Sequence, residues 1–342
     1  MSLQKQGWVS WIGTPFVGLV GAWLATLAGW PLPWITGSLV AIAVVRCAGW
    51  KTSEIPYGRL AGQWLIATSI GLHFTRAMLL VIAGYAPLMA VAALSTLAMA
   101  LLGIALMKRM GMDMPTAYFS FMPANFAEMI NLGSYYRADV SKIAASHALR
   151  LALIVLIVPA LAHIGAGPGE AQAPEVAPVH WGWILGLLVC GACMASLWQR
   201  IGLPNAWMFG PMLICAILTA TFEISTRLPS PLGACGQLMI GCALGCHFDR
   251  GFFRRAPLYL FQVTCYCMTM IALTFFCAYL LSILFRFPFL TLALGMMPGS
   301  TTEMYLTAEA LKLDAGLVTA MQITRLIVIM AFAEPVFKRW SR

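Results

Sequence analysis

Two short segments place polar and acidic side chains next to a proline within apolar stretches of the chain. They are Met122–Met129 (MPANFAEM) and Met297–Met304 (MPGSTTEM). A proline interrupts a helix because it has no backbone N–H and its ring clashes with the preceding turn. Inside a bilayer, backbone groups freed in this way persist only where protein buries them or water reaches them. Each segment therefore predicts a helix break beside a cavity.

The residues around both breaks are suited to binding an ion and a small charged solute. A carboxylate within a membrane segment is costly to bury and is a functional candidate by default, able to bind Na⁺ or to carry a proton. An arginine in the apolar stretch that follows each break can hold an anion in its bidentate fork. The equal alternative is a structural ion pair between these glutamates and arginines. The candidate site residues are Asn125, Glu128, Arg150, Ser300, Thr301, Thr302, Glu303 and Arg325.

The sequence predicts no catalytic residue, metal ligand or cofactor site. Most of the ten cysteines lie in apolar stretches, where a free cysteine behaves as a small buried hydrophobic residue. Cys190 and Cys193 form a CxxC motif without a second pair, so we predict neither a disulfide nor a zinc site. None of the five histidines pairs with another at a ligand spacing. We accordingly expect a protein that is not an enzyme.

Both proline segments belong to a longer internal duplication. Pro31–Gly37 (PLPWITG) matches Pro204–Gly210 (PNAWMFG) at a spacing of 173 residues, and Gly62–Arg76 matches Gly236–Arg250 at 174. The two proline segments match at 175. The shared residues include Trp, His, Pro, Glu and Arg, which apolar composition alone does not align. We predict a first membrane repeat over residues 1–163, an outer linker over 164–180 and a second membrane repeat over 181–342.

Composition places the chain in a lipid bilayer. Of its 342 residues, 61% are hydrophobic and 10% are charged, whereas soluble domains average about 45–50% apolar and about 25% charged residues. Apolar stretches long enough to cross a bilayer recur along the chain. We predict an all-α polytopic membrane protein with two inverted repeats, each of about five transmembrane helices plus a proline-broken re-entrant segment.

The distribution of positive charge predicts the orientation. If the repeats are inverted and the N-terminus lies inside, most Lys and Arg residues of the loops fall on the inner face; a parallel arrangement spreads them more evenly. Cytoplasmic loops are enriched in Lys and Arg, so we predict a bacterial cytoplasmic (inner) membrane protein with both termini in the cytoplasm. The same loops explain the net charge of +9. No basic run is long enough to follow a nucleic acid, and we expect no such partner.

With these residues in view, the chain resembles the AbrB-duplication membrane family, whose members are labelled as ammonia monooxygenases or AbrB-family regulators. The resemblance is carried by the repeated Pro…Trp…Gly block, by Pro298–Ser300 with Glu303–Met304, and by Asp314 and Arg325. It covers nearly the whole chain. Pro123–Asn125 departs from the Pro-Gly-Gly-like element of the family. The predicted arrangement is also similar to glutamate/sodium and citrate symporters, an analogy at the level of the fold.

Inverted repeats with broken segments are the layout of secondary transporters, whose substrates bind near the midplane. We therefore predict a secondary transporter of a small anionic organic solute, coupled to Na⁺ or H⁺; a homodimer would suit this architecture. The alternative is a membrane sensor that affects gene expression indirectly, in line with the regulator label. A membrane monooxygenase is the weaker alternative, because oxygen chemistry needs a metal site, typically built from histidines and carboxylates.

Overall fold

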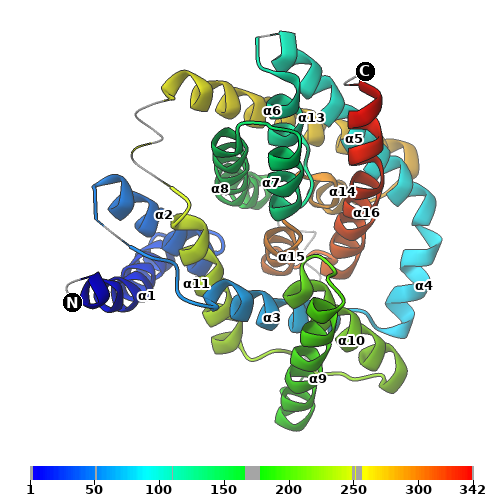
Figure 1. Ribbon diagram of the computed structural model, residues 1–342. Helices are drawn as coiled ribbons and strands as arrows, with labels where there is room; N and C mark the ends of the chain where they lie inside the picture. Colours follow the sequence, from blue (N-terminus) through cyan, green and yellow to red (C-terminus); the bar gives the residue numbers. More distant parts are fainter. Residues whose placement is uncertain are drawn as a thin grey trace. The chain divides into compact units, whose positions relative to one another are not determined.

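The computed structural model describes residues 3–50, 52–109, 111–165, 178–248, 251 and 256–340, and within them the secondary structure elements are all helices. The helices form two compact units. Unit 1 comprises Met1–Val81 and Ala171–Gly251, and unit 2 comprises Ile82–Glu170 and Phe252–Arg342. The units therefore cut across the predicted repeats, since each takes helices from both halves of the sequence (Figure 1). Most of the predicted linker, 164–180, lies outside the described residues.

Unit 1 is built from two corresponding sets of helices. Its helices are α1 (Leu3–Leu27), α2 (Pro33–Cys47), α3 (Gly58–Gly71), α9 (Trp181–Arg200), α10 (Ala206–Phe222) and α11 (Ser230–Gly245). α1 packs on α2 as α9 packs on α10, and α2 packs on α11 as α10 packs on α3. α3 and α11 meet at two glycines: a Cβ atom on Gly62 would lie 2.7 Å from the carbonyl oxygen of Gly236. Only glycine permits so close an approach of the two backbones.

The boundary between the units falls within α4 (Arg76–Gly84). α4 is bent by 85° from α3, and the break at Leu72–Thr75 contains no proline and was not predicted. The apolar stretch Leu79–Met107 is divided between α4 and α5 (Ala86–Arg109). What reads in the sequence as one long span is thus two helices.

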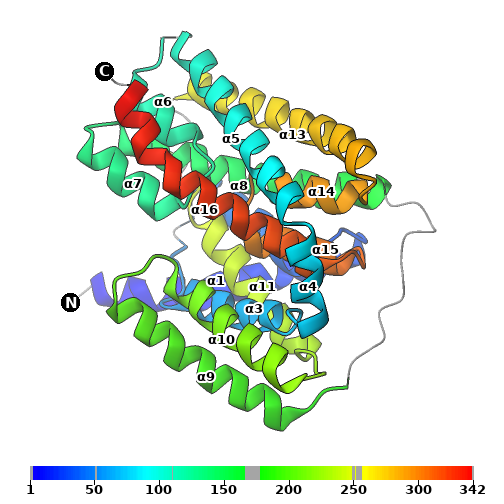
Figure 2. The ribbon, with the colours of Figure 1, turned by 90° about the vertical axis from the view of Figure 1, so that its right-hand side faces the viewer.

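Unit 2 contains both proline breaks. Its helices are α5, α6 (Met114–Phe121), α7 (Phe126–Tyr135), α8 (Val140–Gly165), α13 (Pro257–Phe285), α14 (Phe289–Met296), α15 (Thr301–Ala310) and α16 (Ala315–Trp340). α5 packs on α16 and α8 packs on α13, while α5 and α13 also contact each other (Figure 2). The short helices α6 and α7 lie on α8, and α14 and α15 lie on α16. The four long helices thus hold the two broken pairs.

The backbone repeats at the spacing of the sequence blocks. The bounds of α6, α7 and α8 recur in α14, α15 and α16 at a spacing of 175 residues. Residues with positive φ recur as well, at spacings of 173, 174 or 175. These pairs are Gly29 with Gly202, Leu32 with Asn205, Gly49 with Glu223, Gly111 with Arg286, and Arg137 with Lys312. The duplication therefore extends to the turns that end and begin the helices.

Several described helices suit a membrane. α5, α8, α9, α13 and α16 are long and apolar enough to cross one, and α3 with α4 make a sixth span if the bent pair is counted as one. Shorter apolar helices are Gly13–Leu27, Pro33–Cys47 and Ala206–Phe222. These helices indicate a multi-pass membrane protein, in agreement with the composition.

Candidate functional site

All eight candidate residues lie in unit 2, at equivalent places in its two halves. Asn125 directly precedes α7, and Glu128 is in the first turn of that helix. Ser300 is the N-cap of α15, whose first turn contains Thr301, Thr302 and Glu303. The two arginines lie within α8 and α16. The sequence thus placed each residue at a helix start or on the following long helix.

The prolines end the first helix of each broken pair. Pro123 and Pro298 have no N–H to donate, and the residue before a proline is disfavoured in a helix. Met122 and Met297 are accordingly extended, with ψ of 122° and 130°. The N–H of Ala124 then donates to the carbonyl oxygen of Met122 at 2.9 Å, and the same bond forms in the second break at 2.8 Å. The predicted breaks are confirmed, and they share one local geometry.

An arginine from the following long helix binds the carbonyl groups of each break. Arg150 Nη1 donates to the oxygen of Met122 at 3.4 Å. Arg325 Nη1 donates to the oxygen of Met297, and its Nη2 donates to that of Gly299 at 2.9 Å. A helix C-terminus has unpaired carbonyls and a partial negative charge. A buried guanidinium therefore stabilises a helix end that water does not reach.

A second polar side chain, three residues before each arginine, binds the same short helix. His147 Nε2 donates to the oxygen of Phe119 at 2.9 Å, and its Nδ1 accepts from Arg150 Nη2 at 3.1 Å. These partners assign the neutral tautomer with the proton on Nε2. Gln322 Nε2 donates to the equivalent oxygen, that of Leu294, at 2.6 Å. The imidazole of His147 and the amide of Gln322 therefore bind equivalent carbonyl groups in the two halves.

A small cavity lies where the two breaks approach each other inside unit 2. Its volume is about 10 Å³, room for about one water molecule. It is lined by Phe121, Pro123, Arg150, Ile154, Tyr266, Cys267, Met270 and Pro298. Arg150 therefore faces a space that the prolines of both breaks border.

Both arginines keep an unused donor. In the part of the chain that the structure describes, Arg150 Nε and Arg325 Nε are buried and have no hydrogen-bond partner. Only 6% of Arg150 and 3% of Arg325 are exposed. Buried polar groups are usually satisfied, and two like charges in a medium of low dielectric attract an anion strongly. The arrangement suits an anionic ligand.

The acidic and hydroxyl side chains sit at the N-terminal ends of α7 and α15. Glu128 is half-buried, whereas Glu303 is buried. Ser300 makes no side-chain capping bond to α15. First-turn N–H groups at a helix start, and the positive end of the helix dipole, favour negative charge. Within the described residues, no group of three or more His, Cys, Asp or Glu side chains gathers as metal ligands would.

Sequence reasoning missed the contributions of α13 to this site. Tyr266 and Cys267 line the cavity, and the Tyr266 hydroxyl donates to the oxygen of Phe121 at 3.3 Å. Both residues lie in a uniformly apolar helix, and no motif distinguishes them. Sequence reasoning also missed a larger pocket in unit 1.

Fold and site together define an all-helical, multi-pass membrane protein whose duplicated broken helices are held by buried arginines. A family model described as "Transition state regulatory protein AbrB" matches residues 34–341, and the chain belongs to this AbrB family. "Uncharacterized protein YhjN" of Bacillus subtilis (strain 168) is 22% identical over 350 residues, covering 94% of this chain and 91% of the relative. "Putative regulator AbrB" of Escherichia coli (strain K12) is 24% identical over 306 residues, covering 88% and 87%. The resemblance found in the sequence is confirmed.

Proposed function

We propose that this protein is a secondary transporter in the cytoplasmic membrane of a bacterium, and that it moves a small anionic organic solute. The observation that carries the proposal is the pair of buried arginines, Arg150 and Arg325, at two helix breaks within unit 2. Each has an unused Nε donor. Guanidinium binds carboxylates in a bidentate fork, and ionisable residues within membrane segments mark substrate and ion pathways.

We also propose that the two repeats are oppositely oriented, with both termini in the cytoplasm. The distribution of Lys and Arg among the loops supports this orientation. Equivalent helix breaks in the two halves are also what transporters with inverted repeats display. In such transporters the broken helices lie beside the substrate and ion sites.

The coupling ion, Na⁺ or H⁺, is assigned to the oxygen-rich starts of α7 and α15. A carboxylate takes part in either mechanism, because it can ligate Na⁺ or accept a proton. The proposed ion and substrate residues beside the two arginines are Asn125, Glu128, Ser300, Thr301, Thr302 and Glu303. The proposal includes no enzymatic step.

Uptake by purified protein in liposomes tests the proposal. Radiolabelled mono-, di- and tricarboxylates are presented under a Na⁺ gradient and, separately, under a proton gradient. We expect gradient-dependent uptake of at least one carboxylate, and at least a tenfold lower uptake by Arg325→Lys, which keeps the charge but loses the fork. Arg227→Gln, an exposed change in unit 1, serves as the matched control. No uptake of any carboxylate by correctly folded wild-type protein would refute the proposal.

A sensor that binds an anion without moving it is the second candidate function. The regulator in the name of the Escherichia coli relative favours it. This function predicts that the same carboxylates raise the thermal midpoint of the protein without any flux. It also predicts changed transcript levels in a deletion strain. Uptake in liposomes separates the two functions.

A further inference from the structure

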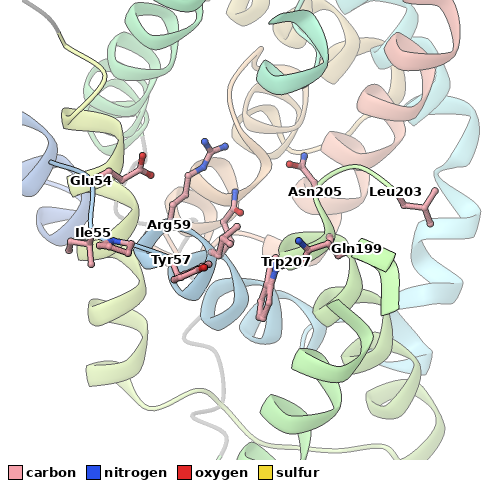
Figure 3. A pocket seen from close by; sticks show the side chains of 12 residues that line it. Glu54, Ile55, Tyr57, Arg59, Gln199, Leu203, Asn205 and Trp207 are labelled. Carbon is pink, nitrogen blue, oxygen red and sulfur yellow. Dashed lines mark hydrogen bonds between the residues drawn. The ribbon is translucent and has the colours of Figure 1, made fainter. Parts of the chain in front are cut away.

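A second pocket lies in unit 1 and is formed entirely by residues of that unit. Its volume is about 640 Å³, within the range of about 300–1,000 Å³ that small-molecule sites occupy. It is lined by Glu54, Ile55, Pro56, Tyr57, Arg59, Leu60, Gln63, Gln199, Leu203, Asn205, Ala206 and Trp207 (Figure 3). The lining therefore combines one carboxylate, one guanidinium, three primary amides and two aromatic rings.

The walls of this pocket are fixed by backbone turns and by tryptophan contacts. Tyr57 and Asn205 adopt left-handed backbone conformations, with φ of 58° and 51°, and they begin α3 and α10 without a side-chain capping bond. Trp207 Nε1 donates to Gln199 Oε1 at 3.2 Å. The Trp207 ring also stands edge-on to Trp64, with ring centroids 6.4 Å apart. The donation from the indole leaves the amide N–H groups of Gln199 directed to other partners.

The two charges of the pocket do not neutralise each other. Arg59 is half-buried and Glu54 is exposed, and the ion pairs that the structure records among the described residues include neither. Figure 3 shows Arg59 between Glu54 and Asn205, with its guanidinium directed away from the helix. A carboxylate and a guanidinium that line one pocket without an ion pair between them suit a ligand that carries both charges.

The charged residues are not shared by the other half of the duplication. The Gln and Trp of the repeated blocks recur in both halves, as Gln63 with Gln237 and as Trp34 with Trp207. Three polar residues of this pocket, two of them charged, correspond to apolar or small residues in the other half of the sequence. These pairs are Glu54 with Leu228, Arg59 with Gly233, and Asn205 with Leu32. The pocket draws its lining from both halves of the sequence, and the equivalent positions of the duplication lack its two charged residues.

We propose that this pocket binds a small zwitterion of the amino-acid type with an apolar or aromatic side group. The carboxylate of the ligand binds Arg59 and the amide of Gln63, and its ammonium group binds Glu54. Trp207 and Leu203 then receive the side group. A ligand with only one of the charges leaves the other charge of the pocket uncompensated, so affinity depends on both.

Binding of three isosteric probes to the full-length protein in detergent tests this site. The probes are L-phenylalanine, 3-phenyllactate, which lacks the ammonium, and phenethylamine, which lacks the carboxylate. We expect calorimetric binding and a raised thermal midpoint with L-phenylalanine, and at least about tenfold weaker binding of the other two. Arg59→Gln and Glu54→Gln should each weaken binding of L-phenylalanine at least about tenfold. Arg200→Gln and Glu309→Gln, both exposed and outside the lining, should leave it unchanged.

Three outcomes overturn the inference. One is that neither L-phenylalanine nor the smaller L-alanine binds to folded wild-type protein. Another is that phenyllactate or phenethylamine binds as tightly as the zwitterion, and the third is that both pocket variants bind like their controls. Arg325→Lys tests independence from the transport proposal: it should lower uptake of carboxylates and leave binding of L-phenylalanine intact. Failure of either proposal is therefore distinguishable from failure of the other.

Discussion

Replacing Arg325 with methionine tests whether buried arginines hold the broken helices. The guanidinium donates to the carbonyl oxygens of Met297 and Gly299, and only 3% of the residue is exposed. A hydrogen bond to a charged group contributes about 1.5–3 kcal/mol, so the loss of two removes about 3–6 kcal/mol. The substitution also removes the cost of burying a charge, which raises the free energy of unfolding and offsets part of this loss. Because the carbonyls then lack a donor, we expect Arg325→Met to lower the free energy of unfolding by about 2–4 kcal/mol.

The equivalent substitution in the other half provides the comparison. Arg150 makes one long carbonyl bond, at 3.4 Å, and one bond to His147. Arg150→Met should therefore cost less, about 1–2 kcal/mol. Both free energies of unfolding are measured by titrating the protein in mixed micelles with SDS and monitoring the loss of helix by circular dichroism. If Arg325→Met is as stable as wild type, or if the two variants lose equal stability, the capping argument is wrong.

Three further predictions concern the glycine packing and two histidines. Gly62→Ala should destabilise the protein by about 1–3 kcal/mol, because the added Cβ atom would lie 2.7 Å from the carbonyl oxygen of Gly236 in α11. Gly182→Ala should leave the stability unchanged in the same SDS titration, because a Cβ atom added there would meet no other atom within 4 Å. Burial holds the pKa of His247, beyond the end of α11, below its ordinary value. As the pH falls, the unfolded chain therefore binds a proton at this histidine at a higher pH than the folded protein does, so the stability of the fold decreases as the pH drops through about 6.5. His247→Gln should make the thermal midpoint decrease less over this pH range. His73→Gln, the equivalent change in the first half, should leave the decrease as it is in the wild type. His147→Gln should stay within about 1 kcal/mol of wild type, because glutamine performs this task in the second half, whereas His147→Leu should lose about 1–3 kcal/mol, measured by SDS unfolding.

The sequence predicts those features that depend on local chemistry. Proline removes a backbone donor, and small or polar residues follow Pro123 and Pro298, so these two breaks can be expected from the local sequence. Pro159 and Pro335, which are followed by apolar residues, lie inside the continuous helices α8 and α16. The duplication is visible because Trp, His and Arg recur in order, and the backbone turns recur at the same spacings. The eight candidate residues gather in one unit because they follow the breaks directly. Their roles in binding remain predictions.

The features that the sequence leaves open depend on tertiary partners. The bend between α3 and α4 has no proline to mark it, and apolar and polar residues alternate across it, at Leu72–Thr75. Tyr266 lies in a helix that is apolar on every side, so its periodicity does not indicate which face meets the cavity. The capping roles of Arg150 and Arg325 depend on carbonyl groups 26 to 28 residues away, which residue types alone do not identify. The unit 1 pocket depends on left-handed turns at Tyr57 and Asn205, neither of which is glycine.

The division of each unit between the two halves of the chain has a consequence for biosynthesis. When the ribosome has completed the first half, α5 and α8 are already made, but their partners α16 and α13 are not. Until the second half is made, Arg150 and other polar groups that the finished protein buries therefore lack part of their packing partners. Two separately encoded halves, expressed together, should therefore be able to assemble both units.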